Sequence, residues 1–539
     1  MFYYLLQMGI PSYFNHIIKN HKKIFKKIKD FNKIHNLYLD SNSIIYDAMR
    51  NIDTSVISQD TEFEEELMKA ICVKITEYIN MVRPDNVFIA FDGVAPVAKL
   101  EQQRQRRYKS QYIKKIENGI RGIKDKNFNW DQTAITPGTR FMKELDAYVK
   151  HYFKQPMKFK CKDIIVSGSN EHGEGEHKIF DYIRLHPEYH KNSETLVYGL
   201  DADLIMLCLN HLHISKHINL FREKPDFNTE LDTLYDENEV CILLIEPLGK
   251  TIIREMSNTT DTININYNKI FDYILISFLL GNDFLPHFPA LNIRTNGITT
   301  IIETYKHVFK PNETIYEKGN ISWRKFGIFI KELSKNEHEN IKHEYKIFNK
   351  QTTIRSRKKD EIEKKIERFN FIPCYNRDIE NMIDPYEKGW ELRYYKLLFN
   401  VNNRNEYIKR ICTNYLEGIE WTMKYYTTGC IHYRWKYNYH YPPLLVDLVK
   451  YVPHFDTDLV ENNMNVINID TQLAYVLPYT SLHLMSSKIK NKLIHNMKEY
   501  YSSSPTFMWA FCKYFWESHV NIQHIEIETL EKIINNPSK

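Results

Sequence analysis

The chain has 539 residues, of which 43% are hydrophobic and 26% charged, a balance that indicates a globular protein and excludes a disordered or fibrous one. At about 150 residues per domain, this length predicts several domain-sized units. The 73 Lys and Arg residues and 68 Asp and Glu residues leave a net charge of only +5, so any basic binding site must be a local feature.

Targeting signals and cysteine pairs give no support for a membrane or secreted protein. No apolar run approaches the roughly 20 residues that span a membrane, and the opening MFYYLLQ lacks the basic start of a secretory signal. The eight cysteines form no CxxC or CxxxC pair, so the sequence predicts neither a zinc ribbon nor a disulfide framework. We therefore expect a reducing, intracellular compartment.

Four short β-branched runs in the first half of the chain each end in a polar turn that precedes a helical pattern. They lie at 37–40, 87–92, 164–167 and 196–201. This alternation predicts an α/β fold with a parallel, doubly wound sheet. Ligands of such sheets bind outside the carboxyl ends of the strands, where three of these runs place Asp40, Asp92 and Asp201.

Seven carboxylates stand where an apolar strand or helix abruptly ends. They are Asp40, Asp92, Glu174, Glu176, Asp201, Asp203 and Asp283. A lone aspartate in such a place is more often a helix N-cap or a turn residue. Seven that converge would repel one another without cations between them, and carboxylate oxygens are the ligands of hard divalent cations. The sequence thus predicts a metal site of the kind that cleaves phosphodiesters with two Mg²⁺ ions.

A basic helix is predicted directly after Asp92, beginning beyond Pro96. Lys99, Gln103, Arg106 and Arg107 share one face of it, at spacings of i, i+4, i+7 and i+8. Arginine forks and a lysine charge suit a terminal phosphate, whereas the alternative is a solvated basic surface. Because the helix begins so close to a predicted metal ligand, we favour the phosphate site.

The later part of the chain changes character twice. Residues 305–384 are rich in Lys, Glu and Asn and include the mixed-charge run RSRKKDEIEKKIERF, which indicates a charged insertion or linker. From 385 onward, aromatic residues recur at helical spacing without the strand and helix alternation. We therefore expect a mostly helical region at 385–539.

Long motifs in a single order resemble the Xrn-type 5′→3′ exoribonucleases. MGIPSYF (8–14), LYLDSNSIIYD (37–47), FDGVAPVAKLEQQRQRRY (91–108), ITPGTRFM (135–142), GEGEHKIFDYIR (173–184), GLDADLIML (199–207) and GNDFLPHFP (281–289) resemble the family's first conserved region. EGIEWTMKYYTTGC (417–430), WKYNYHYPP (435–443) and TQLAYVLP (471–478) resemble the second. Such long motifs are far more specific than a short signature. The resemblance implies a nuclease domain at 1–304 and a second conserved region at 385–539.

The resemblance also implies an activity and a set of site residues. It implies a fold related to flap and PIN nucleases, and processive, Mg²⁺-dependent hydrolysis of single-stranded RNA with a 5′-monophosphate to mononucleotides. Two ions are expected, with Mn²⁺ as a substitute. The seven carboxylates would be the metal ligands and catalytic residues, and Lys99, Gln103, Arg106 and Arg107 would form the 5′-phosphate pocket. We expect a compact, monomeric, cytoplasmic member of the family.

One motif departs from the family pattern. The family stacks the terminal bases of RNA between a histidine and a downstream tryptophan, but this chain has Tyr46 at the histidine position. A tyrosine ring can also stack on a base. The family's paired tryptophans are replaced here by Tyr433 and Trp435, and we predict base stacking by Tyr46 and Trp435.

Two other functions are compatible with part of this pattern. A structure-specific 5′ nuclease acting on DNA would share the acidic cluster, but the second region and the QQRQRR helix match the ribonuclease pattern better. A non-catalytic RNA-binding scaffold could keep the fold, but the presence of all seven carboxylates argues against it.

Overall fold

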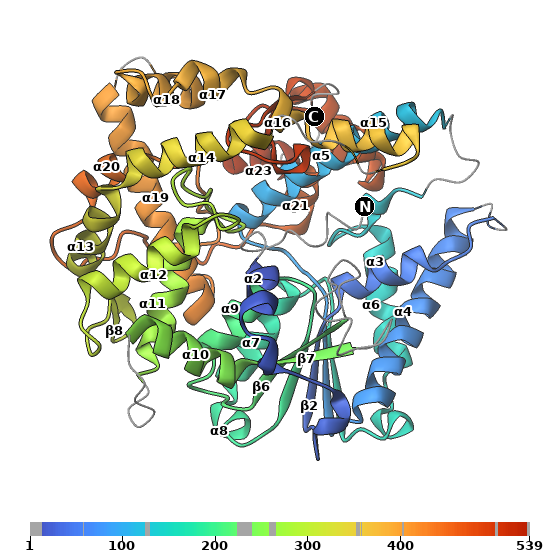
Figure 1. The fold of residues 1–539 in the computed structure, drawn as a ribbon. Coiled ribbons are helices and arrows are strands. Elements are labelled where there is room, and N and C mark those ends of the chain that lie inside the picture. Colours follow the sequence, from blue (N-terminus) through green and yellow to red (C-terminus); the bar gives the residue numbers. More distant parts are fainter. Residues whose placement is uncertain are drawn as a thin grey trace.

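A seven-stranded sheet forms the framework of the first half of the chain (Figure 1). The computed structural model describes residues 13–55, 57, 59–123, 130–223, 240–257, 266–351, 356, 358–401, 404–501 and 505–535. In spatial order the strands are β1 (Phe25–Lys26), β7 (Val240–Leu244), β6 (Ile218–Glu223), β5 (Thr195–Tyr198), β2 (Asn36–Asp40), β3 (Asn86–Ala90) and β4 (Asp163–Ser167). The five strands from β6 to β4 are parallel, and β7 pairs antiparallel with both β6 and β1.

The strand order reverses between β2 and β5. The chain runs from β2 outward to β3 and β4 and then returns to β5 and β6 on the other side. At such a switch point a crevice opens outside the carboxyl ends of the strands, because the connections leave in opposite directions. The four strands predicted from the sequence coincide with β2, β3, β4 and β5. The predicted α/β class with a parallel sheet is therefore confirmed.

Helices cover both faces of the sheet, and alternating side chains on the strands decide which helices each face contacts. In β2, Leu37 and Leu39 pack with the core of one face, and Tyr38 packs with the core of the other. The first core includes side chains of α3 (Asn42–Arg50), α4 (Asp60–Val82) and α6 (Arg140–Tyr152). The second includes α2 (Tyr13–Asn20), α7 (Gly175–Leu185), α9 (Asp203–Asn210), α10 (Ile245–Ser257) and α11 (Asn268–Ser277). The short α8 (Pro187–His190) follows α7.

One long helix, α5 (Val97–Arg121), leaves the sheet and runs into the C-terminal part of the molecule (Figure 1). Its first residues, Val97 and Leu100, are buried in one core cluster with Leu473 and Leu530. Further along, Ile113 packs with Phe515. The helix that carries the predicted basic face is therefore fixed at both ends by the second half of the chain.

The second half is mostly helical in the described residues, which confirms the helical character predicted for 385–539 and extends it to earlier residues. Its helices are α12 (Gly297–Val308), α13 (Trp323–Ser334), α14 (Glu337–Gln351), α15 (Glu361–Asn370), α16 (Ile372–Tyr375), α17 (Asp378–Ile383), α18 (Trp390–Phe399), α19 (Arg404–Thr427), α20 (Leu445–Leu448), α21 (Ile469–Val476), α22 (Ser487–Asn496) and α23 (Ile527–Asn535). Two short hairpins, β8 (Tyr316–Glu317) with β9 (Asn320–Ile321) and β10 (Thr506–Met508) with β11 (His519–Asn521), complete it. Among the described helices, none combines the length and apolar character needed to cross a bilayer.

The charged stretch at 305–384 does not behave as a linker in the described residues. Trp323, Phe326 and Ile330 of α13 are at most 1% exposed and belong to the same large core as the helices beside the sheet. The linker interpretation is therefore wrong for α13, because the apolar face of this helix is buried in the core. The domain boundaries at 304 and 384 remain predictions.

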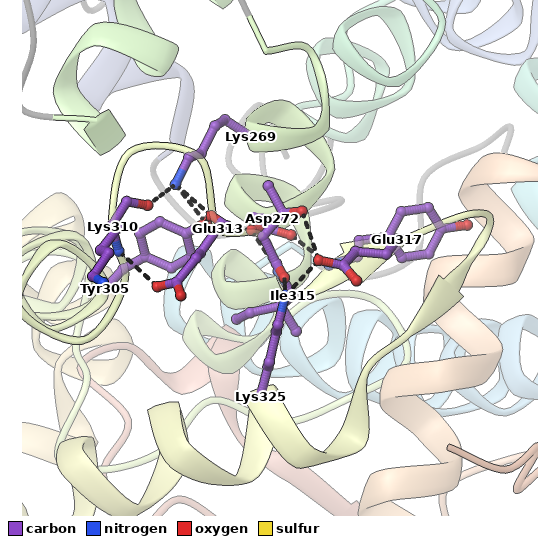
Figure 2. A network of polar contacts seen from close by, with 10 residues as sticks. Lys269, Asp272, Tyr305, Lys310, Glu313, Ile315, Glu317 and Lys325 are labelled. Carbon is purple, nitrogen blue, oxygen red and sulfur yellow. Dashed lines mark hydrogen bonds and ion pairs between the residues drawn. The ribbon is translucent and has the colours of Figure 1, made fainter. Parts of the chain in front are cut away.

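A buried polar network ties this stretch to α11, as Figure 2 shows. The carboxylate of Asp272 accepts hydrogen bonds from the Tyr305 hydroxyl and from the backbone N–H groups of Ile315 (2.8 Å) and Tyr316 (2.7 Å). The ammonium of Lys269 donates to the carbonyl oxygen of Glu313 at 2.7 Å. Buried polar groups need such partners, so these bonds hold the loop before β8 on the core.

Candidate active site

Three parallel strands deliver carboxylates to the same edge of the sheet. Asp40 is the last residue of β2, Asp92 follows the end of β3, and Asp201 follows the end of β5. β2 and β5 flank the switch point and β3 is the neighbour of β2, so the topology brings the carboxyl ends of these three strands together. Helix α7 approaches the same edge, since a Cβ atom on Gly175 would lie only 2.8 Å from Oδ1 of Asp40.

The N-terminus of α7 is fixed against this edge by hydrogen bonds to Asp92. Oδ1 of Asp92 accepts the backbone N–H of Gly175 at 2.7 Å, and Asn42 donates its amide to the other carboxylate oxygen. A residue with a Cβ atom would not fit at Gly175 without a shift, so glycine allows the close approach. Glu174 and Glu176 flank this glycine and are carried into the crevice with it.

Two groups of side chains gather at this edge. Each group holds its ligand atoms within 4.8 Å of one another. The glutamate group consists of Glu174, Glu176 and His177, and the aspartate group consists of Asp201, Asp203 and Asp283. Lys99 joins them, because its ammonium lies 2.5 Å from Oε2 of Glu174 and 2.8 Å from Oδ2 of Asp283.

The carboxylates carry more negative charge than this single lysine offsets. Burial, together with the neighbouring charge of Asp283, raises the pKa of Asp201 to about 7. Burial and the adjacent aspartates raise the pKa of Asp203 well above its usual value, and burial with Asp92 does the same for Asp40. Burial alone would lower the pKa of Lys99, but the negative charges of Asp283 and Glu174 raise this pKa above its usual value. Carboxylates in this situation favour either a proton or a cation between them.

The donor atoms fit a hard divalent cation. Oδ1 of Asp203 is buried and has no hydrogen-bond partner in the described part of the chain, which leaves it free to act as a ligand. Apart from the imidazole of His177, the two groups offer only carboxylate oxygens. Oxygen-rich donor sets suit Mg²⁺, Mn²⁺ and Ca²⁺ better than softer metals. The crevice can therefore bind metal ions.

Residues that sequence reasoning missed complete the site from the second half of the chain. Tyr425 of α19 donates its hydroxyl hydrogen to Oε1 of Glu174 at 2.7 Å, and Tyr426 lies beside Asp203. His177 was also missed as a group member, although it directly follows Glu176 in the GEGEH motif. The tyrosines carry no charge pattern, and only their place in the motif KYYTTGC singled out that segment.

The predicted phosphate-binding face of α5 is divided between two surroundings. Lys99 is 5% exposed and lies among the carboxylates, whereas Arg107 lies about 12 Å further along the helix at 1.5 Å per residue. Tyr46 and Asp131 lie near the guanidinium group of Arg107. Burial lowers the pKa of Arg107 to about 10. One guanidinium nitrogen of Arg107, Nη1, is buried without a hydrogen-bond partner among the described residues.

The two remaining residues of this face, Gln103 and Arg106, occupy the stretch of α5 between Lys99 and Arg107. Gln103 is 8% exposed and Arg106 is half-buried. The structure thus places Tyr46 near one end of the basic face and the metal-binding groups near the other. The phosphate-binding roles of the four residues stay predictions.

Trp435, for which the sequence predicts base stacking, packs against another indole ring. Its indole stacks on Trp421 with ring centroids 5.1 Å apart, donates to Glu417 at 3.3 Å and is 8% exposed. This packing places the ring in the core, and the base-stacking role of Trp435 stays a prediction. Tyr433 is half-buried, and its carbonyl oxygen accepts the N–H of Val97 at the start of α5.

Comparison with protein-family models identifies two consecutive domains. Residues 8–224 match the model described as "XRN 5'-3' exonuclease N-terminus", whose first matched positions, 8–12, lie outside the described residues. Residues 264–373 and 373–503 match "Xrn1 helical domain". The second match begins before residue 305 and runs through much of the stretch that we expected to be an insertion or linker.

Curated relatives agree with these matches. The chain is 28% identical to "5'-3' exoribonuclease 1" of Saccharomyces cerevisiae over 89% of its own length and 40% of the relative. It is also 28% identical to the human protein of the same name, over 82% of the chain and 29% of the relative. A "5'-3' exoribonuclease 2 homolog" of Drosophila melanogaster is 28% identical over 83% of the chain and 59% of the relative. The chain thus spans less than two thirds of the length of each of these relatives.

Both domain models occur in one order and together account for most of the chain, including all seven predicted carboxylates. Asp40, Asp92, Glu174, Glu176, Asp201 and Asp203 fall in the first match, and Asp283 falls in the second. The similarity expected from the motifs is thereby confirmed, and the chain belongs to the Xrn family.

Proposed function

We propose that this protein is a 5′→3′ exoribonuclease that processively hydrolyses single-stranded RNA with a 5′-monophosphate to mononucleotides. The observation that carries the proposal is the meeting of two acidic groups at the sheet edge where α5 begins. That arrangement places a metal-binding crevice beside a basic helix. The names of the curated relatives support the direction of cleavage and RNA as the substrate.

The glutamate and aspartate groups, with Asp40 and Asp92, would hold two Mg²⁺ ions, for which Mn²⁺ can substitute. When bound, the ions would lower the pKa of water and offset the negative charge on the leaving oxygen. Lys99 orients one carboxylate from each group, since its ammonium contacts both Glu174 and Asp283. Asp92 orients the start of α7 through its bond to Gly175.

Selection of the RNA end belongs to the basic face of α5 in this proposal. A 5′-monophosphate is a small dianion, and arginine guanidinium groups bind such groups through paired, charge-assisted hydrogen bonds. The unpartnered Nη1 of Arg107 offers a donor for this purpose. The half-buried ring of Tyr46 beside it would stack on the first base. A closed pocket of this kind would reject a cap or a triphosphate by size.

Matched RNAs with 5′-monophosphate, 5′-triphosphate and 5′-hydroxyl ends test this proposal, each offered with Mg²⁺ and again with EDTA. We expect mononucleotide release from the monophosphate RNA alone, and only with Mg²⁺. A 5′-phosphorylated DNA of the same sequence is the fourth substrate. Faster cleavage of the DNA would favour a structure-specific DNA nuclease, and tight RNA binding without any cleavage would favour a non-catalytic scaffold. Either result would contradict the proposal.

A further inference from the structure

The end of α19 carries two consecutive tyrosines that each reach one acidic group. The hydroxyl of Tyr425 donates to Oε1 of Glu174 at 2.7 Å, while the phenol of Tyr426 lies beside Asp203. Both side chains are nearly fully buried, at 2% and 1% exposure. One turn of a helix from the second half of the chain therefore contacts both halves of the metal-binding crevice.

A stack of aromatic rings fixes the position of Tyr425. Its ring lies against His177 with centroids 3.6 Å apart and planes at 22°, and against Trp421 with centroids 4.8 Å apart at 28°. Trp421 in turn stacks on Trp435 at 5.1 Å. Trp421 and Tyr425 are four residues apart, so they share one face of α19. The stacked rings therefore extend from Trp435 in the core to His177 of the glutamate group.

The hydrogen bond of Tyr425 sets the orientation of Glu174. The carboxylate of Glu174 is held at both oxygens, because Oε1 accepts from Tyr425 and Oε2 faces the ammonium of Lys99. Without the Tyr425 hydroxyl, the Glu174 carboxylate would keep its contact with Lys99 and could rotate toward that ammonium group. The Tyr425 ring also packs against His177 of the same group, so a single residue restrains two of its three members.

We propose that Tyr425 is a positioning residue for the metal site: it holds the Glu174 carboxylate and the His177 ring in the arrangement in which the glutamate group binds a divalent cation. Tyr426, the next residue of α19, lies beside Asp203 of the aspartate group. In this way α19 is part of the metal site although it contributes no ligand. The inference rests on the proposed function, because it assumes that the crevice binds catalytic metal ions.

A Mn²⁺ titration without RNA tests this role. The electron paramagnetic resonance signal of free Mn²⁺ reports how much of the ion is bound. Tyr425→Phe keeps the ring stack and removes only the hydroxyl. Loss of a hydrogen bond to a charged group predicts about a tenfold weaker Mn²⁺ affinity in this variant. The Mg²⁺ concentration that gives half-maximal RNA cleavage should rise by a similar factor. The melting temperature, measured in parallel, should fall about as much as in a control variant that loses another buried hydroxyl.

The matched control is Tyr394→Phe. Tyr394 of α18 is also fully buried and donates its hydroxyl to a backbone carbonyl, that of Pro442, at 2.8 Å. This control should lose stability without any change in Mn²⁺ affinity. Equal Mn²⁺ affinity in Tyr425→Phe and wild type would overturn the inference, and so would a wild type that binds no Mn²⁺. A wild type that binds Mn²⁺ but cleaves no RNA would instead contradict the proposed function, while the comparison of affinities would still decide the role of Tyr425.

Discussion

Asp201 illustrates how a single side chain at a strand end is expected to act on catalysis without acting on binding. It is 3% exposed and shares the aspartate group with Asp203 and Asp283. We expect Asp201→Asn to lower the rate of RNA hydrolysis by about a thousandfold or more, because a metal ligand acts on the transition state. RNA affinity should change little, since basic residues supply most of it. Single-turnover cleavage and a binding titration measure the two quantities.

The control for this variant is Asp458→Asn, which changes an exposed aspartate that pairs with Lys424. It should cleave RNA at the wild-type rate. Wild-type turnover by Asp201→Asn at saturating Mg²⁺ would show that the metal site has been assigned to the wrong carboxylates.

Tyr46 gives a second prediction at the residue scale, because its ring is half-buried on α3 near Arg107. If the first base stacks on it, Tyr46→Ala should remove about 1–3 kcal/mol of stacking and lower processivity on a long 5′-phosphorylated RNA. Tyr46→Phe should behave like the wild type, since stacking needs the ring and not the hydroxyl, and Tyr46→His should be tolerated.

The alternative for Tyr46 is a purely structural role, because its ring also packs against the core that contains α3 and α4. In that case the alanine variant would have a lower melting temperature and unchanged product lengths. Product-length distributions measured beside thermal stability separate the two roles. A stable alanine variant that releases no shortened intermediates would rule out stacking.

At the scale of secondary structure elements, α5 connects the acidic groups to the basic face that we propose recognises the RNA end. Its start lies among the carboxylates through Lys99, and its middle carries Arg106 and Arg107. We expect the double variant Arg106→Ala/Arg107→Ala to lose its preference for 5′-monophosphate over 5′-hydroxyl RNA. Each charge-assisted bond to a buried phosphate contributes about 1.5–3 kcal/mol, which is enough for a clear change in the ratio of the two rates.

A control for the arginine pair lies on the same helix. Arg121, at the end of α5, forms an exposed ion pair with Glu363, so Arg121→Ala should keep the full preference. The ratio of initial rates on the two RNAs is the measurement for both variants. An unchanged ratio in the double variant would mean that another surface recognises the phosphate.

Elements differ in how well the sequence predicts them, and the reasons are physical. Strands β2, β3 and β5 were predictable because each is a short, largely apolar run that ends near an aspartate. Helix α13 was hidden by the surrounding Lys and Glu residues, although its buried positions 323, 326, 330 and 333 recur at helical spacing. Counting charges over a long window thus obscured an amphipathic helix whose apolar face is buried.

The aromatic residues of the second half show where prediction from the sequence ends. Trp421 and Tyr425 have the four-residue spacing of one helix face, and Trp435 follows that helix. Nothing in the spacing of these residues distinguishes a core ring from one that reaches the metal site or stacks on a base. The difference depends on which long-range neighbour each ring meets. Only the folded structure places Tyr425 at Glu174 and Trp435 in the core.

At the scale of the whole molecule, buried polar contacts join segments that are far apart in the sequence. Glu337, at the start of α14, is 2% exposed and accepts the backbone N–H groups of Leu445 (2.6 Å) and Val446 (3.0 Å). These donors belong to the first turn of α20, where backbone N–H groups have no partner within the helix. A single carboxyl group therefore anchors the segment that follows α19 onto the helices before it.

This anchor predicts a pH dependence of stability. Burial, reinforced by the nearby charge of Asp447, raises the pKa of Glu337 to about 8 from an ordinary value of 4.5. Because the folded state holds the proton more tightly than the unfolded state, the contribution of Glu337 to the free energy of unfolding is fully present below pH 4.5. It is lost as the pH rises through about 8.

Replacing Glu337 by glutamine removes the titrating group and keeps a carbonyl oxygen that can accept one of the two N–H bonds. We expect the wild type to lose stability relative to Glu337→Gln as the pH is raised from 5 to 9, by an amount on the order of a few kcal/mol, since one pKa unit corresponds to about 1.4 kcal/mol. Chemical denaturation of both proteins at pH 5, 7 and 9 measures the difference. A difference that stays constant over this range, or that changes in favour of the wild type, would show that the Glu337 carboxyl has no raised pKa in the folded protein.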